Sequence, residues 1–123
     1  MRPRIVIVDD DPSFLATVRL LLENEGFVVV GEALNGLDGV AAVAELDPDI
    51  VLVDVNLPDI DGFEVVERLV DGGRAAPVVL TSIRSAEDFG DLVDASPARG
   101  FVPKAEISAE TLAVFLEERP SSG

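Results

Sequence analysis

The fold of this chain is decided by one stretch, residues 50–62: Ile50-Val51-Leu52-Val53-Asp54-Val55-Asn56-Leu57-Pro58-Asp59-Ile60-Asp61-Gly62. Four apolar residues lead directly into Asp54, and a loop rich in turn-forming residues follows. An unbroken apolar run of this length is typical of a strand in a parallel sheet, which helices cover on both faces. Asp54 would then stand at the carboxyl end of that strand, where open α/β sheets bind ligands. Taken alone, Asp54 could equally be a solvated acid that ends a strand.

Composition narrows the possible functions. The chain has 123 residues, a formal net charge of −15 and a sequence pI near 4.1, which indicates one acidic domain. Such a surface repels nucleic acid, so we expect no direct DNA or RNA binding. The chain contains neither cysteine nor histidine, which excludes a disulfide framework, a thiolate metal site and a phosphohistidine. No apolar run approaches the roughly 20 residues of a membrane span, and we expect a cytoplasmic location with no membrane contact.

Hydrophobic patterns predict five strands alternating with five helices. Further apolar runs occur at 5–8, 28–30, 78–80 and 100–102. We therefore predict an α/β fold: a flavodoxin-like, doubly wound (βα)5 unit with a five-stranded parallel sheet in the order 2-1-3-4-5. Residues 1–119 would form the domain, and 120–123 a flexible tail or linker stub.

Local signals give finer expectations. The second strand should end at Gly31, and the third helix should bury a stripe of Phe63, Val66, Leu69 and Val70. A weaker fourth helix should begin at Ser85, with Gly90 and Pro97 diluting its pattern. Asp11, Asn35 and Asp61 are the expected caps of the first three helices.

Chemically distinctive side chains stand at four of the predicted strand ends. These are Asp9 and Asp10, Asp54, Thr81, and Lys104, the only lysine in the chain. Because several carboxylates in one cleft repel each other, a cation is expected among them, and Mg²⁺ prefers oxygen ligands. Asp10 and Asp54 would bind it directly, Asp9 directly or through water, and the backbone carbonyl of Asn56 could also point to it. Singly, each residue has a plainer interpretation, such as an acidic first helical turn or an ordinary strand-end hydroxyl.

Four motifs resemble the receiver (response-regulator) domain of two-component signalling. They are Val8-Asp9-Asp10-Asp11-Pro12, residues 52–62, Leu80-Thr81-Ser82 and Gly100-Phe101-Val102-Pro103-Lys104. The resemblance implies that Asp54 accepts a phosphoryl group from a sensor histidine kinase or phosphotransfer protein with Mg²⁺ as cofactor. It implies that Asp9 and Asp10 are the acidic pair of the metal site and that Lys104 binds phosphate. Thr81 would be the switch hydroxyl, and Phe101 the aromatic that swings inward.

The resemblance also carries expectations about partners. The face made by the fourth helix, fifth strand and fifth helix would signal to a downstream protein target or output domain. The kinase would dock near Phe14, Leu15 and Val18, and the chain would be a monomer or a phosphorylation-linked dimer. It would be no enzyme, but a phosphoacceptor that takes part in its own phosphorylation and dephosphorylation. One departure is that Ala105 follows the lysine and Pro103 precedes it, which leaves the aim of Lys104 open.

Several alternatives remain at this stage. The chain could be a stand-alone receiver, which we favour, or the receiver part of a longer DNA-binding transcriptional regulator. It could be a pseudo-receiver that no longer takes phosphate. An aspartate-nucleophile hydrolase of the haloacid dehalogenase type would need Asp-x-Asp and a cap domain. A flavodoxin-like mononucleotide binder would need a phosphate loop where this chain has three acids.

Overall fold

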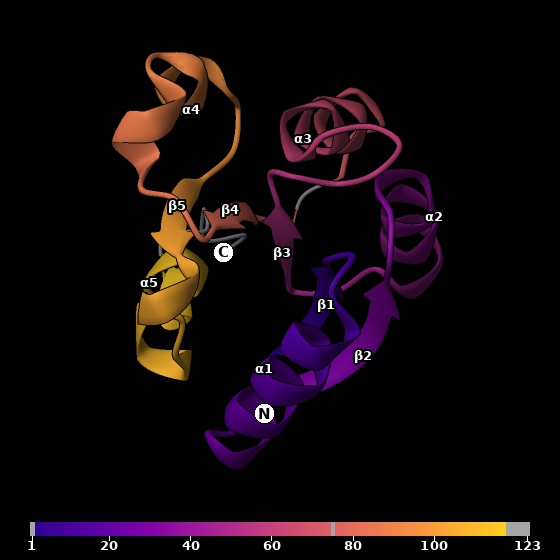
Figure 1. Cartoon of the computed structure of the whole chain (residues 1–123). Helices are drawn as coiled ribbons and strands as arrows, with labels where there is room; N and C mark the ends of the chain where they lie inside the picture. The colour runs from indigo at the N-terminus through magenta and orange to yellow at the C-terminus, as the bar shows by residue number, and fades with distance from the viewer. Residues whose placement is uncertain (1, 75, 118–123) are drawn as a thin grey trace.

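One parallel five-stranded sheet forms the centre of the molecule (Figure 1). A computed structural model describes residues 2–74 and 76–117. The sheet has the order β2-β1-β3-β4-β5, which confirms the predicted doubly wound α/β fold. The strands are β1 (Arg4–Val8), β2 (Val28–Ala33), β3 (Ile50–Asp54), β4 (Val78–Ser82) and β5 (Gly100–Pro103). The tail expected at 120–123 lies outside the described residues.

Within the described residues, five α-helices and two short 3₁₀ turns connect or follow the strands. They are α1 (Pro12–Asn24), α2 (Gly36–Leu46), α3 (Gly62–Asp71), η1 (Ala86–Phe89), α4 (Leu92–Ala95), η2 (Lys104–Glu106) and α5 (Ala109–Glu117). The side chains of Asp11, Asn35 and Asp61 accept backbone N–H bonds at the starts of α1, α2 and α3. Each cap satisfies an N–H group that has no partner within the helix, so these three predicted helix starts are confirmed.

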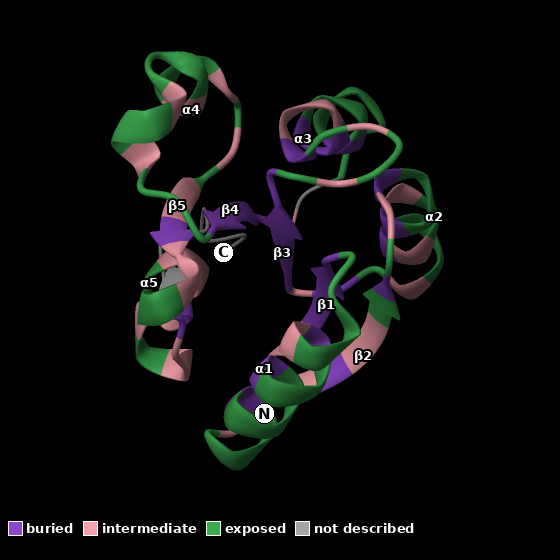
Figure 2. Ribbon diagram, in the orientation of Figure 1, coloured by how far each residue is buried: buried purple, intermediate pink, exposed green. Residues whose placement is uncertain are grey.

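Alternation along the strands builds two separate apolar layers. In β1, Ile5 and Ile7 face the layer that contains the buried residues of α1 and α5, whereas Val6 and Val8 face that of α2 and α3. Successive side chains of a strand point to opposite faces, so a continuous apolar run is buried on both. Figure 2 shows the inner strands as buried and the outer surfaces of the helices as exposed. Because both faces of the sheet are covered, the polar residues that follow these strands lie at the edge formed by the carboxyl ends of the strands.

The second strand is longer than predicted. β1 and β2 pair up to Val8 opposite Ala33, and the N–H of Asp9 donates to the carbonyl of Ala33 at 3.0 Å. The register shifts between Ile5 and Val6, which leaves an extra residue in β2 before Gly31. The expected end at Gly31 was therefore wrong, because the bulge lets pairing continue past the glycine.

The buried stripe of α3 also differs from the expectation. Val65, Val66 and Leu69 are buried, whereas Val70 is 47% exposed and Phe63 is only half-buried. The sheet-facing side of the helix is centred on Val66, which turns Val70 toward solvent. Phe63 packs against Phe89 instead, with ring centroids 5.9 Å apart in an edge-to-face arrangement.

Ser85 and Asp88 form the expected capping box, but they cap a short 3₁₀ turn and not a single fourth helix. Ser85 precedes the 3₁₀ turn η1, and Gly90 then takes a positive φ of 58°. α4 is four residues long and ends before Pro97. Glycine in this conformation and a proline that disfavours helical geometry before it divide one weak helix into two short pieces.

Asp59 ties the loop after β3 to the start of α2. Its carboxylate accepts hydrogen bonds from the N–H groups of Gly36 at 2.7 Å and Leu37 at 2.9 Å. Desolvation acts to raise the pKa of Asp59, but the backbone N–H donors, Leu37 and Gly36 first, outweigh it and lower that pKa below 3.8. The charged carboxylate is therefore the form that the folded state prefers.

Replacement of Asp59 by asparagine should lower the stability of the fold at neutral pH. Because the folded-state pKa is depressed, the stability that Asp59 contributes is present above its ordinary value of 3.8 and is lost as pH falls through the lower folded value. The urea unfolding midpoints of wild type and Asp59→Asn should therefore differ at neutral pH, and the difference should shrink as pH falls below 3.8. Asp71→Asn, a change on the exposed end of α3, is the matched control. A gap between wild type and Asp59→Asn that widens in acid would contradict the prediction.

No helix within residues 2–74 and 76–117 is long and apolar enough to cross a membrane.

Candidate functional site

The carboxyl ends of four strands meet at one edge of the sheet. Val8 of β1 pairs with Val53 of β3, and Asp54 pairs with Thr81 of β4, so the next residues on each strand are neighbours. Parallel strands bring their carboxyl ends to the same edge, where the order 2-1-3-4-5 reverses direction between β1 and β3. This edge carries the acids and the lysine singled out in the sequence.

Asp9, Asp10 and Asp54 form a compact group of carboxylates. One oxygen from each lies within 4.8 Å of the others. Asp9 is fully buried and Asp54 is 5% exposed, whereas Asp10 faces solvent. The N–H of Asp11 donates to Asp9 Oδ1 at 2.9 Å, and the N–H of Asn56 donates to Asp54 Oδ1 at 3.0 Å. Each buried carboxylate thus uses one oxygen to fix its orientation and keeps the other for the centre of the group.

Lys104 reaches into this group from the end of β5. Its Nζ lies 2.7 Å from Asp9 Oδ2 and 3.2 Å from Asp54 Oδ2. The same ammonium lies 4.1 Å from the centroid of the Phe14 ring. Pro103 had left the aim of this side chain open, and the structure directs it at both buried acids.

The charges of the group act on each other. Burial raises the pKa of Asp54, and the Asp9 carboxylate adds to this, while the N–H of Asn56 and the Lys104 ammonium oppose it. Partial burial works against a charged Lys104, yet its contacts with Asp9 and Asp54 outweigh that cost and raise its pKa. The ionised form of Asp54 is therefore disfavoured by burial, and a further positive charge nearby would stabilise it.

The donors present fit a hard divalent cation. Three carboxylates and one ammonium leave an excess of two negative charges at the edge. Asp9 Oδ2 is buried and accepts no hydrogen bond within the described part of the chain, where its contact is the ion pair with Lys104. Oxygen ligands with one solvent-exposed acid are the set that Mg²⁺ prefers, since it retains part of its water shell. The N–H of Asn56 donates to Asp54, and its carbonyl stays an expected ligand.

Thr81 lies opposite Asp54 and Phe101 lies on the next strand, β5, and both side chains are engaged away from the acids. The Thr81 hydroxyl is buried and donates to the carbonyl of Val102 at 2.6 Å. Phe101 is half-buried, and its ring centroid lies 5.9 Å from that of Phe89, which in turn contacts Phe63. The hydroxyl expected to reach a phosphoryl group is therefore bonded to β5 in this structure.

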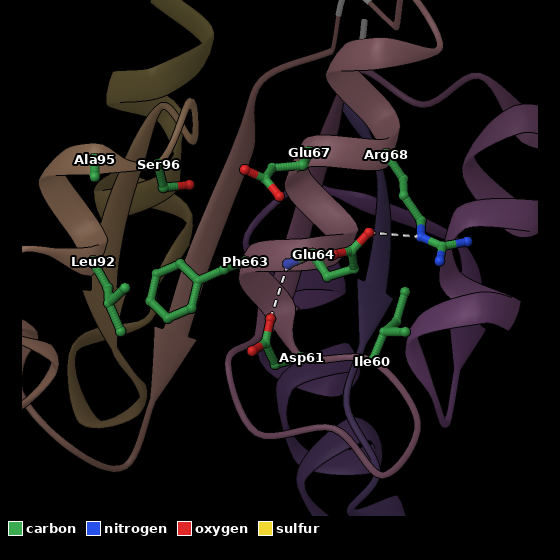
Figure 3. A pocket seen from close by; sticks show the side chains of 9 residues that line it. All are labelled: Ile60, Asp61, Phe63, Glu64, Glu67, Arg68, Leu92, Ala95 and Ser96. Carbon is green, nitrogen blue, oxygen red and sulfur yellow. Dashed lines mark hydrogen bonds and ion pairs between the residues drawn. The ribbon is translucent and has the colours of Figure 1, made fainter.

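A groove of about 530 Å³ lies between α3 and α4, with Phe63 and Leu92 on opposite sides of it (Figure 3). Its α3 side carries Asp61, Glu64 and Glu67. None of the residues expected in the functional site lines this groove. The rings of Phe63, Phe89 and Phe101 nevertheless form a continuous line of contacts from the groove to β5.

Two of the three residues expected to dock the kinase are not available at the surface. Leu15 is 4% and Val18 is 2% exposed, because both pack into the layer between α1 and the sheet. Phe14 is half-buried, and its ring covers the Lys104 ammonium. Phe14 was expected at the kinase-docking surface, and its contact with Lys104 was not predicted from the sequence.

Residues 5–115 match the family model described as the response regulator receiver domain. The chain belongs to this family. Among curated relatives, the receiver domain is 38% identical over 106 residues to BvgA of Bordetella pertussis, named as a positive transcription regulator of virulence factors, covering 86% of this chain and 51% of BvgA. It is 32% identical over 101 residues to the DNA-binding transcriptional activator EvgA of Escherichia coli K12, covering 82% and 50%.

Solved structures agree on the fold of the receiver domain. The signal receiver domain of NarL from Mycobacterium tuberculosis superposes with a TM-score of 0.88 at 24% identity, covering 96% of this chain and 98% of that one. A LuxR-family two-component response regulator from Aurantimonas sp. gives 0.81 at 28% identity, covering 99% and 91%. The chain spans about half the length of BvgA and EvgA. It is a receiver domain of two-component response regulators.

Proposed function

We propose that this receiver domain accepts a phosphoryl group on Asp54 from a sensor histidine kinase or phosphotransfer protein, in a step that requires Mg²⁺. The observation that carries the proposal is the arrangement of charge at the sheet edge. Asp54 has one oxygen held by the N–H of Asn56 and the other beside the Lys104 ammonium, within reach of two further carboxylates. A carboxylate held in this way is ready to attack phosphorus in line, since such transfers depend mainly on positioning and charge neutralisation.

The transfer makes one bond and breaks one. An Asp54 oxygen forms a bond to phosphorus as the bond from phosphorus to the donor atom breaks, and the donor leaves with that electron pair. The product is an acyl phosphate, which water later hydrolyses. Mg²⁺, held by Asp9, Asp10, Asp54 and the Asn56 carbonyl, would neutralise charge on the carboxylates and phosphoryl oxygens.

Lys104 and Thr81 would bind the product. The Lys104 ammonium already contacts Asp54, and a phosphoryl oxygen there would offer it a doubly charged partner. Thr81 would give up its bond to the carbonyl of Val102 and donate to another phosphoryl oxygen. Both residues would also act after the transfer step, because their contacts with the phosphoryl group favour the phosphorylated arrangement of β4 and β5.

The new charge would then move the switch. Release of Val102 by Thr81 would free space for Phe101 to turn inward, reshaping α4, β5 and α5 as the output face. The contact of Phe101 with Phe89, and of Phe89 with Phe63, supports an additional route toward α3 and its groove. The chain would thus work as a phosphoacceptor with two states and not as an enzyme that turns over a separate substrate.

Phe89→Leu should weaken the link between the switch and α3. Aromatic pairs contribute about 0.5–1.5 kcal/mol beyond buried area, and this change removes two of them. Amide NMR shifts of α3 residues should respond to a phosphoryl analogue in wild type and respond less in Phe89→Leu. Leu92→Ala, which alters the groove but none of the three rings, is the control. Equal responses of α3 in wild type and Phe89→Leu would refute the route.

The length of this chain relative to its relatives and its net charge indicate what kind of partner it would signal to. Since the chain spans about half the length of DNA-binding relatives, a second candidate is the receiver part of a longer transcriptional regulator. The formal charge of −15 argues against contact with DNA by this chain itself, so an output domain or a downstream protein would make it. A monomer, or a dimer formed on phosphorylation, is compatible with either form.

Fluoroberyllate, which mimics a phosphoryl group on aspartate, tests the proposal. Fluorine NMR should detect a stoichiometric bound signal only when Mg²⁺ and fluoroberyllate are both present, and a chelator should remove it. A bound flavin mononucleotide instead would favour the mononucleotide-binding alternative. Failure of wild-type protein to bind fluoroberyllate with Mg²⁺ would overturn the phosphoacceptor assignment and leave a pseudo-receiver.

A further inference from the structure

We propose that Phe14 is a positioning residue that holds the Lys104 ammonium between Asp9 and Asp54. The inference deepens the proposed function, since it rests on Lys104 serving Asp54. The Nζ atom of Lys104 lies 2.7 Å from Asp9, 3.2 Å from Asp54 and 4.1 Å from the centroid of the Phe14 ring. Two carboxylates and one aromatic face thus surround a single cation.

Lysine needs such a third contact more than arginine would. Its ammonium is a compact charge on a flexible four-carbon stem, so two carboxylates fix its position less tightly than they would fix a planar guanidinium. An aromatic face attracts a cation within about 6 Å of its centroid through the ring quadrupole. The ring closes the third side and leaves the side chain only 14% exposed. It does so without offering a competing hydrogen-bond acceptor.

The ring is itself well fixed. Phe14 lies in the first turn of α1, whose start is set by the Asp11 cap and Pro12. Its ring packs against the apolar layer that contains Leu15 and Val18. The same short segment therefore supplies Lys104 with one of its acids, Asp9, and with its aromatic face.

This contact has a consequence for phosphoryl transfer. A lysine held by a third carboxylate would have to break an ion pair to reach a phosphoryl oxygen. A lysine held by a ring keeps its charge available and its direction set, which is the condition for rapid electrostatic stabilisation. Replacement of Phe14 by leucine keeps an apolar side chain but removes the quadrupole, whereas tyrosine keeps the ring. If Phe14 served only to fill apolar space, leucine and tyrosine would not be expected to differ in this way.

Lys104 gives a direct spectroscopic test because it is the only lysine in the chain. Protein grown with ¹³C-labelled lysine and kept in chelator should give one set of lysine side-chain signals. In wild type and Phe14→Tyr, the protons next to Nζ should be shifted upfield by the ring. In Phe14→Leu they should move to the position of a solvated lysine.

Transfer from acetyl phosphate with Mg²⁺, followed by intact mass, gives the second measurement. Phe14→Leu should slow uptake roughly three- to tenfold, and Phe14→Tyr should stay within about twofold of wild type. Phe115→Leu is the matched control, since Phe115 is another half-buried phenylalanine packed on the same apolar layer. Urea unfolding of each variant ensures that rates are compared between folded proteins.

The outcomes separate the two proposals. Loss of the upfield shift and slower uptake in Phe14→Leu, with rescue in Phe14→Tyr, would establish Phe14 as a positioning residue. An unshifted lysine signal in wild type, or a Phe14→Leu rate no lower than that of Phe115→Leu, would overturn this inference. A shifted signal in a wild type that takes up no phosphoryl group would support the Phe14 contact and refute the proposed phosphoacceptor function.

Discussion

Asp54→Asn should abolish uptake of a phosphoryl group, because an amide oxygen is a poor nucleophile and its acyl phosphate cannot form. Intact mass after incubation with acetyl phosphate and Mg²⁺ should show one added phosphoryl group on wild type and none on the variant. Asp11→Asn is the matched control. It makes the same chemical change at an exposed helix cap, where asparagine serves as well as aspartate. Phosphorylated Asp54→Asn would place the acceptor elsewhere.

The same substitution should stabilise the fold. Burial raises the pKa of Asp54 above 3.8, so the contribution of Asp54 to stability is fully present below pH 3.8 and is lost as pH rises through its higher folded-state pKa. At neutral pH without Mg²⁺, Asp54→Asn should therefore unfold at a higher urea concentration than wild type. Mg²⁺ should raise the stability of wild type more than that of the variant, since a ligand that binds the folded state stabilises it. A less stable variant in chelator would contradict this account of the site.

Gly62→Ala should be the most damaging substitution next to the site. A Cβ on Gly62 would lie 2.5 Å from the carbonyl oxygen of Asp54 and 2.8 Å from the Cα of Val55. Both are backbone atoms of β3 and its continuation, and the N–H of Gly62 donates to the carbonyl of Val55 at 2.8 Å. Since neither neighbour can rotate away, we expect a loss of about 3 kcal/mol in the free energy of unfolding, together with displacement of Asp54.

Gly26→Ala provides the comparison for Gly62→Ala. Gly26 has a φ of 105° and no atom within 4 Å of its virtual Cβ, so alanine there would strain the backbone without a clash. Gly26 lies between α1 and β2, at the opposite end of the strands from Asp54. Both variants should lose stability in urea, but only Gly62→Ala should lose phosphoryl uptake while still folded. Normal uptake by folded Gly62→Ala would show that the turn does not position Asp54.

Long, regular patterns made the fold predictable. The apolar run before Asp54 and the similar run before Asp9 indicated strands covered on both faces, and alternation with helices indicated the sheet order. The weaker signals failed where a local pattern met a tertiary constraint. β2 continued past Gly31 because of a bulge against β1, and the expected fourth helix was divided at Gly90.

The candidate site was predictable in part for the same reason. Residues that directly follow parallel strands must meet at one edge, which placed Asp9, Asp54 and Lys104 together from sequence order alone. Side chains that reach the edge from elsewhere carried no such signal. Phe14 was expected only at the kinase-docking surface and no role was expected for Phe89, yet their rings lie against Lys104 and Phe101.

The amino-acid sequence by itself determined the family, the sheet and the set of acids at its edge, because backbone periodicity and chain order dictate which residues end a strand. Only the tertiary structure decided where Lys104 points, that the Thr81 hydroxyl is bonded to Val102, and that Phe14 covers the ammonium. Those features depend on side-chain torsions and on contacts between elements distant in sequence, and packing of the whole domain selects them.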